Sequence, residues 1–348
     1  MQTPTSPGLH STNEWNPIRS RKLGEAFARA GGLALFILLT VIFFAVISQG
    51  KFLEFQNLMG ILRYMSTLAI VGLGLTVVLI LGDIDLSFGS VYGLAGTTLA
   101  VAWMSWSFPL WIALLISLVA ALLVGVLNAT LVCFVRLPAF IATLGTGTLA
   151  IGFVLLIGNA ERFTPAYPTA GEEVSSRELS FFEGISNLSL PAGIPMQVIW
   201  MVLIAVAFWI LLHRSLFGFR ARAIGGNITA ARLAGLPVTK YRFIAFGLVA
   251  LTAAVAVFLD FAFIGSVSPD SGTSLLFPVF AAVIIGGASL SGGRGTVGGT
   301  LLGSLLLAVM ANGLALMAAA PYVQQLFLGF VTIGAVVLDQ GTRAWRSR

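Results

Sequence analysis

The chain has 348 residues, of which 58% are hydrophobic and only 9% are charged. Soluble domains carry about 25% charged residues, so this composition excludes a soluble fold and predicts an all-α membrane protein that crosses the bilayer many times. The net charge of +6 does not indicate nucleic-acid binding, because the basic residues gather at the ends of apolar runs. One cysteine and two histidines make a metal site or another cofactor unexpected.

Both ends of the chain are polar and basic. Residues 1–29 contain three prolines and four basic residues before the first long apolar run, and they predict a disordered cytoplasmic tail. The apolar run that follows could be a signal peptide, but the long tail and the many later runs favour a retained first helix. Residues 341–348 predict a second cytoplasmic tail.

Apolar runs of roughly 20 residues recur between these tails, which is the length that crosses a ~30 Å hydrocarbon core. They predict a transmembrane domain over 30–340 with about ten helices and with both termini cytoplasmic, because most Lys and Arg residues then fall inside. Two polar segments interrupt it: 159–195, an extracytoplasmic loop with several glutamates, and 214–242, a basic cytoplasmic loop. The expected spans are approximately 30–49, 64–82, 87–107, 110–134, 138–158, 196–213, 243–264, 276–291, 296–317 and 321–339.

Two carboxylates, Asp83 and Asp85, interrupt the apolar sequence near the end of the second span. Charge within a membrane costs roughly 2.5–3.5 kcal/mol per residue on insertion scales, so such acids are candidates for function. The surrounding glycines and serines predict a broken helix near Asp83–Ser90, with Ser87 or Ser90 capping the restart. Two interpretations stay open: these side chains line a translocation pathway, or Asp85 only caps a helix.

Lone polar side chains occur in several other spans. The side-chain amides of Asn128, Asn312 and Gln324 are examples. Amides of this kind commonly join neighbouring helices by hydrogen bonds, and they could also line a route for a hydroxyl-rich solute. The complete set of pathway candidates is Asp83, Asp85, Ser87, Ser90, Asn128, Thr143, Asn312 and Gln324.

The run Gly286–Gly299 looks at first like a phosphate-binding loop. It lacks the Gly-Lys-Ser/Thr ending whose lysine and hydroxyl contact phosphate and Mg²⁺, so the chain is not expected to hydrolyse ATP. The run predicts a tight turn between two short helices. The turn residues are Gly286, Gly287, Gly292, Gly293 and Gly295.

The segment Gly218–Arg242 predicts a short capped helix within the basic loop. Asn227 is a favourable N-cap, residues 228–234 favour a helix, and Gly235 followed by Pro237 ends it. The helix could be a connector on the membrane surface or a docking element for a cytoplasmic partner. The docking candidates are Gly225, Gly226, Asn227, Ala230, Ala231, Arg232, Leu233 and Gly235.

Three of these stretches together resemble the permeases of bacterial ABC sugar importers of the ribose/xylose type. The matching stretches are Gly-Gly-Asn with Ala-Ala-Arg-Leu-Ala-Gly, the run Ile-Asp-Leu-Ser-x-Gly-Ser, and the glycine run at 286–299. The resemblance implies a multi-pass protein of the bacterial inner membrane that works beside a second permease subunit. It also implies a cytoplasmic ABC ATPase, an extracytoplasmic solute-binding protein and a sugar or related polyol as cargo.

One stretch departs from that family. Many members have an acid before the glycine run, where this chain has Leu276-Phe277-Pro278, so ordinary ribose specificity is not expected. The hypothesis is a non-enzymatic permease that contacts lipid, its partners and sugar. The alternative is a secondary transporter driven by an ion gradient, with Asp83, Asp85 and Asp260 as a sparse relay.

Overall fold

The protein is an α-helical bundle, seen here in a computed structural model that describes residues 17–168, 174–188 and 193–346. In that part of the chain the extended pairing consists of one isolated bridge between Phe163 and Val267. The helices are α1 (Pro17–Ile47), α2 (Phe55–Ile80), α3 (Phe88–Ala100), α4 (Leu110–Thr130), α5 (Ala139–Gly158), α6 (Ser176–Asn187), α7 (Met196–Trp209), α8 (Leu216–Gly226), α9 (Ile228–Leu233), α10 (Val238–Ile264), α11 (Leu276–Ile285), α12 (Val297–Leu316) and α13 (Pro321–Arg346). Short π-helical turns extend α3, α4 and α7.

Two helices form the centre of the bundle. α10 packs against α2, α3 and α4, and α2 also contacts α7, α11 and α12. In its most apolar window α2 is 83% buried, whereas α4 and α7 are each 28% buried. α2 is therefore enclosed by protein, while α4 and α7 leave apolar side chains free to face lipid.

The expectation of about ten transmembrane helices is wrong. Within the described residues, six helices are long and apolar enough to cross a membrane: Phe55–Ile80, Leu110–Val135, Ala139–Gly158, Met196–Arg214, Val238–Ile264 and Val297–Leu316. The other expected spans contain shorter helices or shorter apolar segments, such as α3 with 13 residues and α11 with 10. Both are enclosed by neighbouring helices, so they need not match the bilayer thickness, and counting apolar runs overestimates the spans.

The N-terminal tail also differs from the expectation. α1 begins at Pro17, so residues 17–29 are helical, and residues 1–16 lie outside the described residues. Proline is favourable at the first helical position, and the strong helix formers after it let the apolar helix extend outward. At the other end α13 continues to Arg346, into the expected C-terminal tail.

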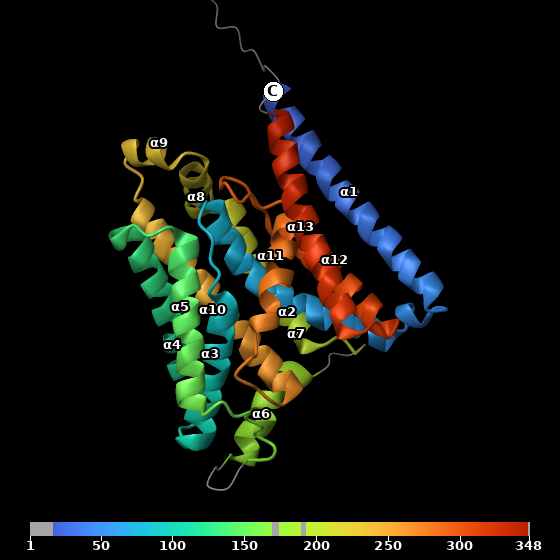
Figure 1. Cartoon of the computed structure of the whole chain (residues 1–348), viewed down its shortest axis with the longest axis vertical. Coiled ribbons are helices and arrows are strands. Elements are labelled where there is room, and N and C mark those ends of the chain that lie inside the picture. The colour runs from blue at the N-terminus through green and yellow to red at the C-terminus, as the bar shows by residue number, and fades with distance from the viewer. Residues whose placement is uncertain (1–16, 169–173, 189–192, 347–348) are drawn as a thin grey trace, which may run out of the picture.

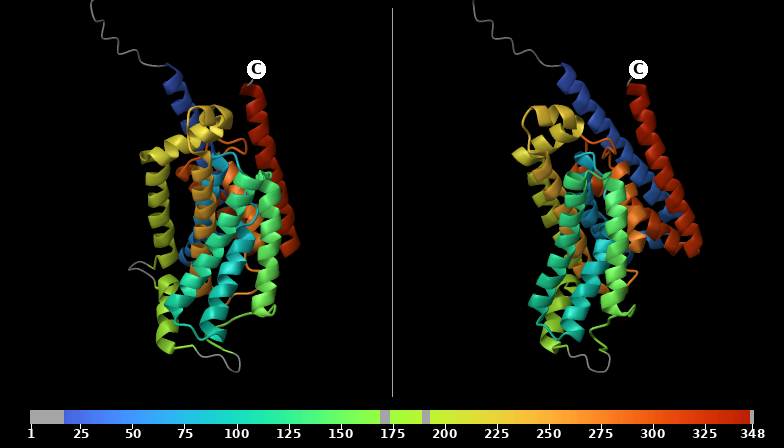
Figure 2. Two further views of the ribbon diagram at one scale, coloured as in Figure 1. Left: turned by 90° about the vertical axis from the view of Figure 1, so that its left-hand side faces the viewer. Right: turned by 60° about the vertical axis from the view of Figure 1, so that its left-hand side comes forward.

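The molecule has two distinct ends. Figure 1 shows α8 and α9 at one end, together with the first turn of α1 and the last turn of α13, and α6 at the opposite end. Both turned views in Figure 2 keep this arrangement. α8 and α9, which come from the polar segment 214–242, therefore lie at the opposite end of the bundle from α6, which comes from the segment 159–195.

Candidate functional site

Three glycine-bearing segments meet beside α8. They are the end of α2 and the residues after it (Ile80–Gly82), the end of α8 (Gly225–Gly226), and Gly292–Gly293 in the turn between α11 and α12; we call this contact the glycine junction. Gly293 donates its backbone N–H to the carbonyl oxygen of Ile80 over 2.8 Å. A Cβ at Gly225 would overlap that same oxygen and lie 2.7 Å from the nitrogen of Gly293. The three backbones therefore touch directly, and only glycine allows this approach.

The glycine run forms a turn between helices, although α12 is a long helix and not the short one expected. Gly292 has a φ of 82° and packs against Gly225 and Gly82. The other predicted turn residues hold the same region together. Gly286 packs against Gly299 between α11 and α12, Gly287 has a φ of 92°, and Gly295 lies against the side chain of Ile80.

The predicted cap of the short helix α9 is confirmed. Asn227 Oδ1 accepts a hydrogen bond from the backbone N–H of Ala230 over 3.0 Å, and Gly235 has a φ of 75° after the helix end. Ala231 is buried, whereas Arg232 is exposed and Leu233 is 87% exposed. α9 thus presents one apolar and one basic side chain outward. The preceding helix, α8, is held in place by Arg222, which donates to the carbonyl oxygens of Leu212 and Gly295.

An ion pair joins α10 to the break after α2. Arg242 Nε lies 2.7 Å from Asp83 Oδ2, and Arg242 Nη2 donates to Asp83 Oδ1 over 2.8 Å. The two side chains are only 14% and 7% exposed. The sequence singled out Asp83 but not its partner, because 159 positions separate them. The one available signal is that both are charges beside long apolar runs.

The chain is not helical between Ile80 and Phe88, in the region where the sequence predicts a break. The predicted serine cap is wrong: Ser87 precedes α3, but its hydroxyl donates to Asp85 Oδ1 over 2.6 Å. That oxygen also accepts from the backbone N–H of Ser87 over 2.7 Å. Asp85 therefore fixes the turn that leads into α3, which supports the capping interpretation over pathway lining.

The polar contacts continue from Asp85 into two further helices. Asn128 of α4 donates to Ser87 Oγ over 2.8 Å, and Thr146 of α5 donates to Asn128 Oδ1. Thr143, on the turn before Thr146, accepts from the backbone N–H of Leu86 over 3.0 Å. All of these side chains are buried. We call Asp85, Ser87, Asn128 and Thr146 the Asp85 network, and it satisfies the polar groups of a broken segment within the protein.

The remaining pathway candidates do not join this network. Ser90 lies in the first turn of α3 and is half-buried, Asn312 is on α12, and Gln324 of α13 donates to the carbonyl of Ala319. The amide groups of Asn312 and Gln324 make no hydrogen bond with Asn128. The structure therefore does not connect the three amides into one polar route.

A second polar cluster lies around Asp260, near the end of α10. Asp260 Oδ2 accepts from Tyr92 Oη over 2.6 Å, and Oδ1 accepts from Thr67 Oγ1 over 2.8 Å and from Gln197 Nε2 over 3.3 Å. We call these four residues, from α10, α3, α2 and α7, the Asp260 centre. The sequence offered Asp260 only as a possible ion relay. The other three had no signal, because each is a single polar residue in an apolar helix.

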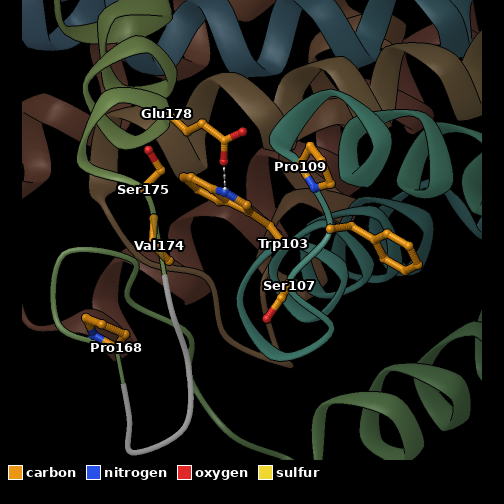
Figure 3. Close-up of a pocket in the computed structure, with 8 residues that line it drawn as sticks. Trp103, Ser107, Pro109, Pro168, Val174, Ser175 and Glu178 are labelled. Carbon is orange, nitrogen blue, oxygen red and sulfur yellow. Dashed lines mark hydrogen bonds between the residues drawn. The ribbon is translucent and has the colours of Figure 1, made fainter.

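α6 covers the end of the bundle next to the Asp260 centre. Ser186 and Asn187 donate to the carbonyls of Leu259 and Ala262 on α10. Glu178 accepts from Trp103 Nε1 over 2.9 Å, and Figure 3 shows this bond in an open pocket of about 640 Å³. α6 is therefore anchored to the π-helical turn after α3 and to α10 through side chains of the long polar segment.

The fold and these contacts define a class of protein. A polytopic helical bundle presents a capped helix at one end, links it by backbone contact to a broken helix, and holds a satisfied polar cluster at the other end. These are features of a membrane permease whose interior responds to an element outside the bilayer. The histidine, cysteine and carboxylate residues in the described ranges form no group suited to a metal ion.

Comparison with known proteins gives the family. Residues 57–336 match the family described as branched-chain amino acid transport system, permease component, and the chain belongs to it. It is 33% identical over 308 residues to the ribose import permease protein RbsC of Bacillus subtilis, covering 88% of this chain and 91% of that protein. It is 33% identical to the fructose import permease protein FrcC of Rhizobium meliloti, covering 88% and 84%. It is 34% identical over 270 residues to the autoinducer 2 import system permease protein LsrD of Klebsiella pneumoniae, covering 78% and 79%.

The chain is thus a multi-pass permease of the bacterial cell membrane, and the expected resemblance to ABC importer permeases is confirmed at the level of the family. The same relatives support a transport subunit over an enzyme, and an importer permease over the ion-gradient alternative.

Proposed function

We propose that the chain is the permease subunit of an ATP-driven importer and that a separate ATPase subunit docks on α9. The glycine junction carries this proposal. A push on α8 and α9 would reach Ile80 through backbone atoms in contact, without a flexible side chain between them. The outward-facing Leu233 and Arg232 suit a protein surface that combines an apolar pocket with acidic groups.

The arrangement of the two ends supports an assignment of sides. The end with α8, α9, the first turn of α1 and the last turn of α13 is cytoplasmic, and the end with α6 faces the outside. A solute-binding protein would then deliver cargo at the end that α6 covers. A second permease subunit, identical or different, completes the membrane assembly, and lipid covers the exposed apolar faces of α4, α5 and α7.

The proposed cargo is a monosaccharide or a related polyol. The relatives named above are described as importing ribose, fructose and autoinducer 2, which are small oxygen-rich solutes. Ribose itself is a weaker candidate, because Leu276-Phe277-Pro278 has no acid where many ribose-type permeases have one. In this stretch Phe277 is 55% exposed and Pro278 is buried in the first turn of α11.

Reconstitution tests the proposal. Vesicles that contain the permease, its ATPase and its binding protein are expected to take up at least one labelled sugar only when ATP is present. The permease alone is expected to take up none on a proton or sodium gradient. Replacing Asn227 and Arg232 together is expected to leave the protein inserted and to uncouple ATP hydrolysis from uptake. Sugar flux driven by an ion gradient through the permease alone would overturn the proposal. Normal ATP-driven uptake by the double variant would show that α9 is not the docking element for the ATPase.

A further inference from the structure

We propose that the Asp260 centre, with Arg63 and two aromatic side chains beside it, is a binding site for a neutral, hydroxyl-rich solute. This inference rests on the proposed function and adds the place where cargo is held. Asp260 lies about 33 Å along α10 from Val238, at roughly 1.5 Å per residue, so the site is far from α9. It lies instead beside the part of α10 that α6 contacts, at the end where cargo would arrive.

Two buried polar atoms at this place have no protein partner. Gln197 is 2% exposed, and its Nε2 donates to Asp260 and to the carbonyl of Leu259, which leaves Oε1 without a hydrogen bond. Arg63 is half-buried, and its Nε is likewise unpartnered. The Arg63 guanidinium lies 4.2 Å from the ring centre of Phe263, one turn after Asp260. One acceptor and one donor therefore stay unsatisfied around the same turn of α10, although buried polar groups in proteins are normally paired.

The chemistry of these groups selects the ligand. A hydroxyl group both donates and accepts, so a hydroxyl-rich solute offers a partner to an acceptor such as the Gln197 oxygen and to a donor such as the Arg63 nitrogen. Tyr64 and Phe263, each 36% exposed, offer aromatic surface for the apolar face of a sugar ring. A cation is disfavoured because Arg63 is positive and three donors already occupy the Asp260 carboxylate. An anion is disfavoured by that same carboxylate.

The site is mechanically joined to the glycine junction. Thr67, which donates to Asp260, lies on α2, and the same helix ends at Ile80 about 20 Å away at roughly 1.5 Å per residue. Tyr92 lies on α3, the helix that starts at the Asp85 network. A displacement of α2 at the junction therefore moves Thr67 relative to Asp260. This gives the solute different contacts in two states of the protein, as any shift between states requires.

Saturation-transfer NMR on the full-length permease in lipid nanodiscs tests the site without the binding protein. The probes are D-ribose, D-fructose and myo-inositol, with L-leucine as a zwitterionic comparison. At least one of the three hydroxyl-rich probes is expected to receive saturation from the wild-type protein. The signal is expected to fall at least fivefold in Arg63→Met and in Gln197→Leu, and to persist in the matched control Arg177→Gln, an exposed arginine on α6.

Folding of each variant is checked by size-exclusion chromatography and thermal unfolding. Wild-type signals in both folded variants would overturn the site, as would saturation of L-leucine alone. If a substitution prevents folding, the conservative variants Arg63→Lys and Gln197→Asn are measured in the same way, and a reduced signal is again expected. Failure of the proposed function is recognised separately, because wild-type vesicles with all subunits would then show no ATP-driven uptake, whether or not the purified permease binds a sugar.

Discussion

Arg242 and Asp83 form a two-point ion pair that fastens the second turn of α10 to the break after α2. The pair lies next to Gly82, which belongs to the glycine junction. The beginning of α10, the end of α2 and the end of α8 are therefore held at one place. In the proposed mechanism, a force applied at α9 would reach the broken helix through these contacts.

This ion pair makes the first prediction. Arg242→Leu is expected to lower the stability of the purified permease by about 3–5 kcal/mol, because it leaves the buried Asp83 carboxylate without a compensating charge. The double variant Asp83→Asn with Arg242→Gln removes both charges and is expected to cost less than Arg242→Leu. Thermal unfolding in detergent measures both, and equal melting temperatures for Arg242→Leu and wild type would contradict the pairing.

The glycine junction makes the second prediction, with a matched pair of adjacent glycines. A Cβ at Gly225 would overlap the carbonyl oxygen of Ile80, whereas a Cβ at Gly226 would meet nothing within 4 Å. Gly225→Ala is expected to reduce ATP-driven uptake at least tenfold in the assembled transporter, because α8 must move away from α2. Gly226→Ala is expected to stay within twofold of wild type. Similar uptake rates for the two variants would exclude force transfer through this contact.

The Asp85 network makes the third prediction, again with a pair on one helix. Thr146→Val leaves the buried Asn128 oxygen without a donor, which is expected to cost about 1–3 kcal/mol of stability. Thr148 is exposed, and its hydroxyl bonds only the carbonyl of Leu144 in its own helix. Thr148→Val is expected to change stability by no more than about 0.5 kcal/mol. Thermal unfolding of the two variants should separate them clearly, and no separation would mean that Thr146 does not support the network.

The cap of α9 makes the fourth prediction. Asn227→Ala removes the side-chain acceptor for the N–H of Ala230 and is expected to destabilise the helix by about 1 kcal/mol. Hydrogen exchange of the peptide covering residues 228–233 is expected to become about fivefold faster, while exchange in α2 stays unchanged. Asn227→Ser keeps a capping oxygen and is expected to exchange almost as slowly as wild type. Unchanged exchange in Asn227→Ala would show that tertiary contacts alone hold α9.

Several features could be predicted from local sequence. The low fraction of charged residues set the class of protein, because a chain so poor in charge cannot cover itself with a soluble surface. The cap at Asn227, the left-handed Gly235 and the break around Asp83–Ser87 are also local, since each depends on the conformational preferences of a few neighbouring residues. The glycine run predicted a turn for the same reason.

The tertiary structure decided which distant groups meet and how many helices are long enough to span a membrane. Apolarity alone could not distinguish α3 and α11, which are short and enclosed by protein, from helices that face lipid. The partner of Asp83, the meeting of three glycine segments and the Asp260 centre all depend on packing between helices far apart in the chain. A single buried threonine, tyrosine or glutamine has no local signature. The free-energy cost of burying its polar group depends on the hydrogen-bond partner that the fold brings to it.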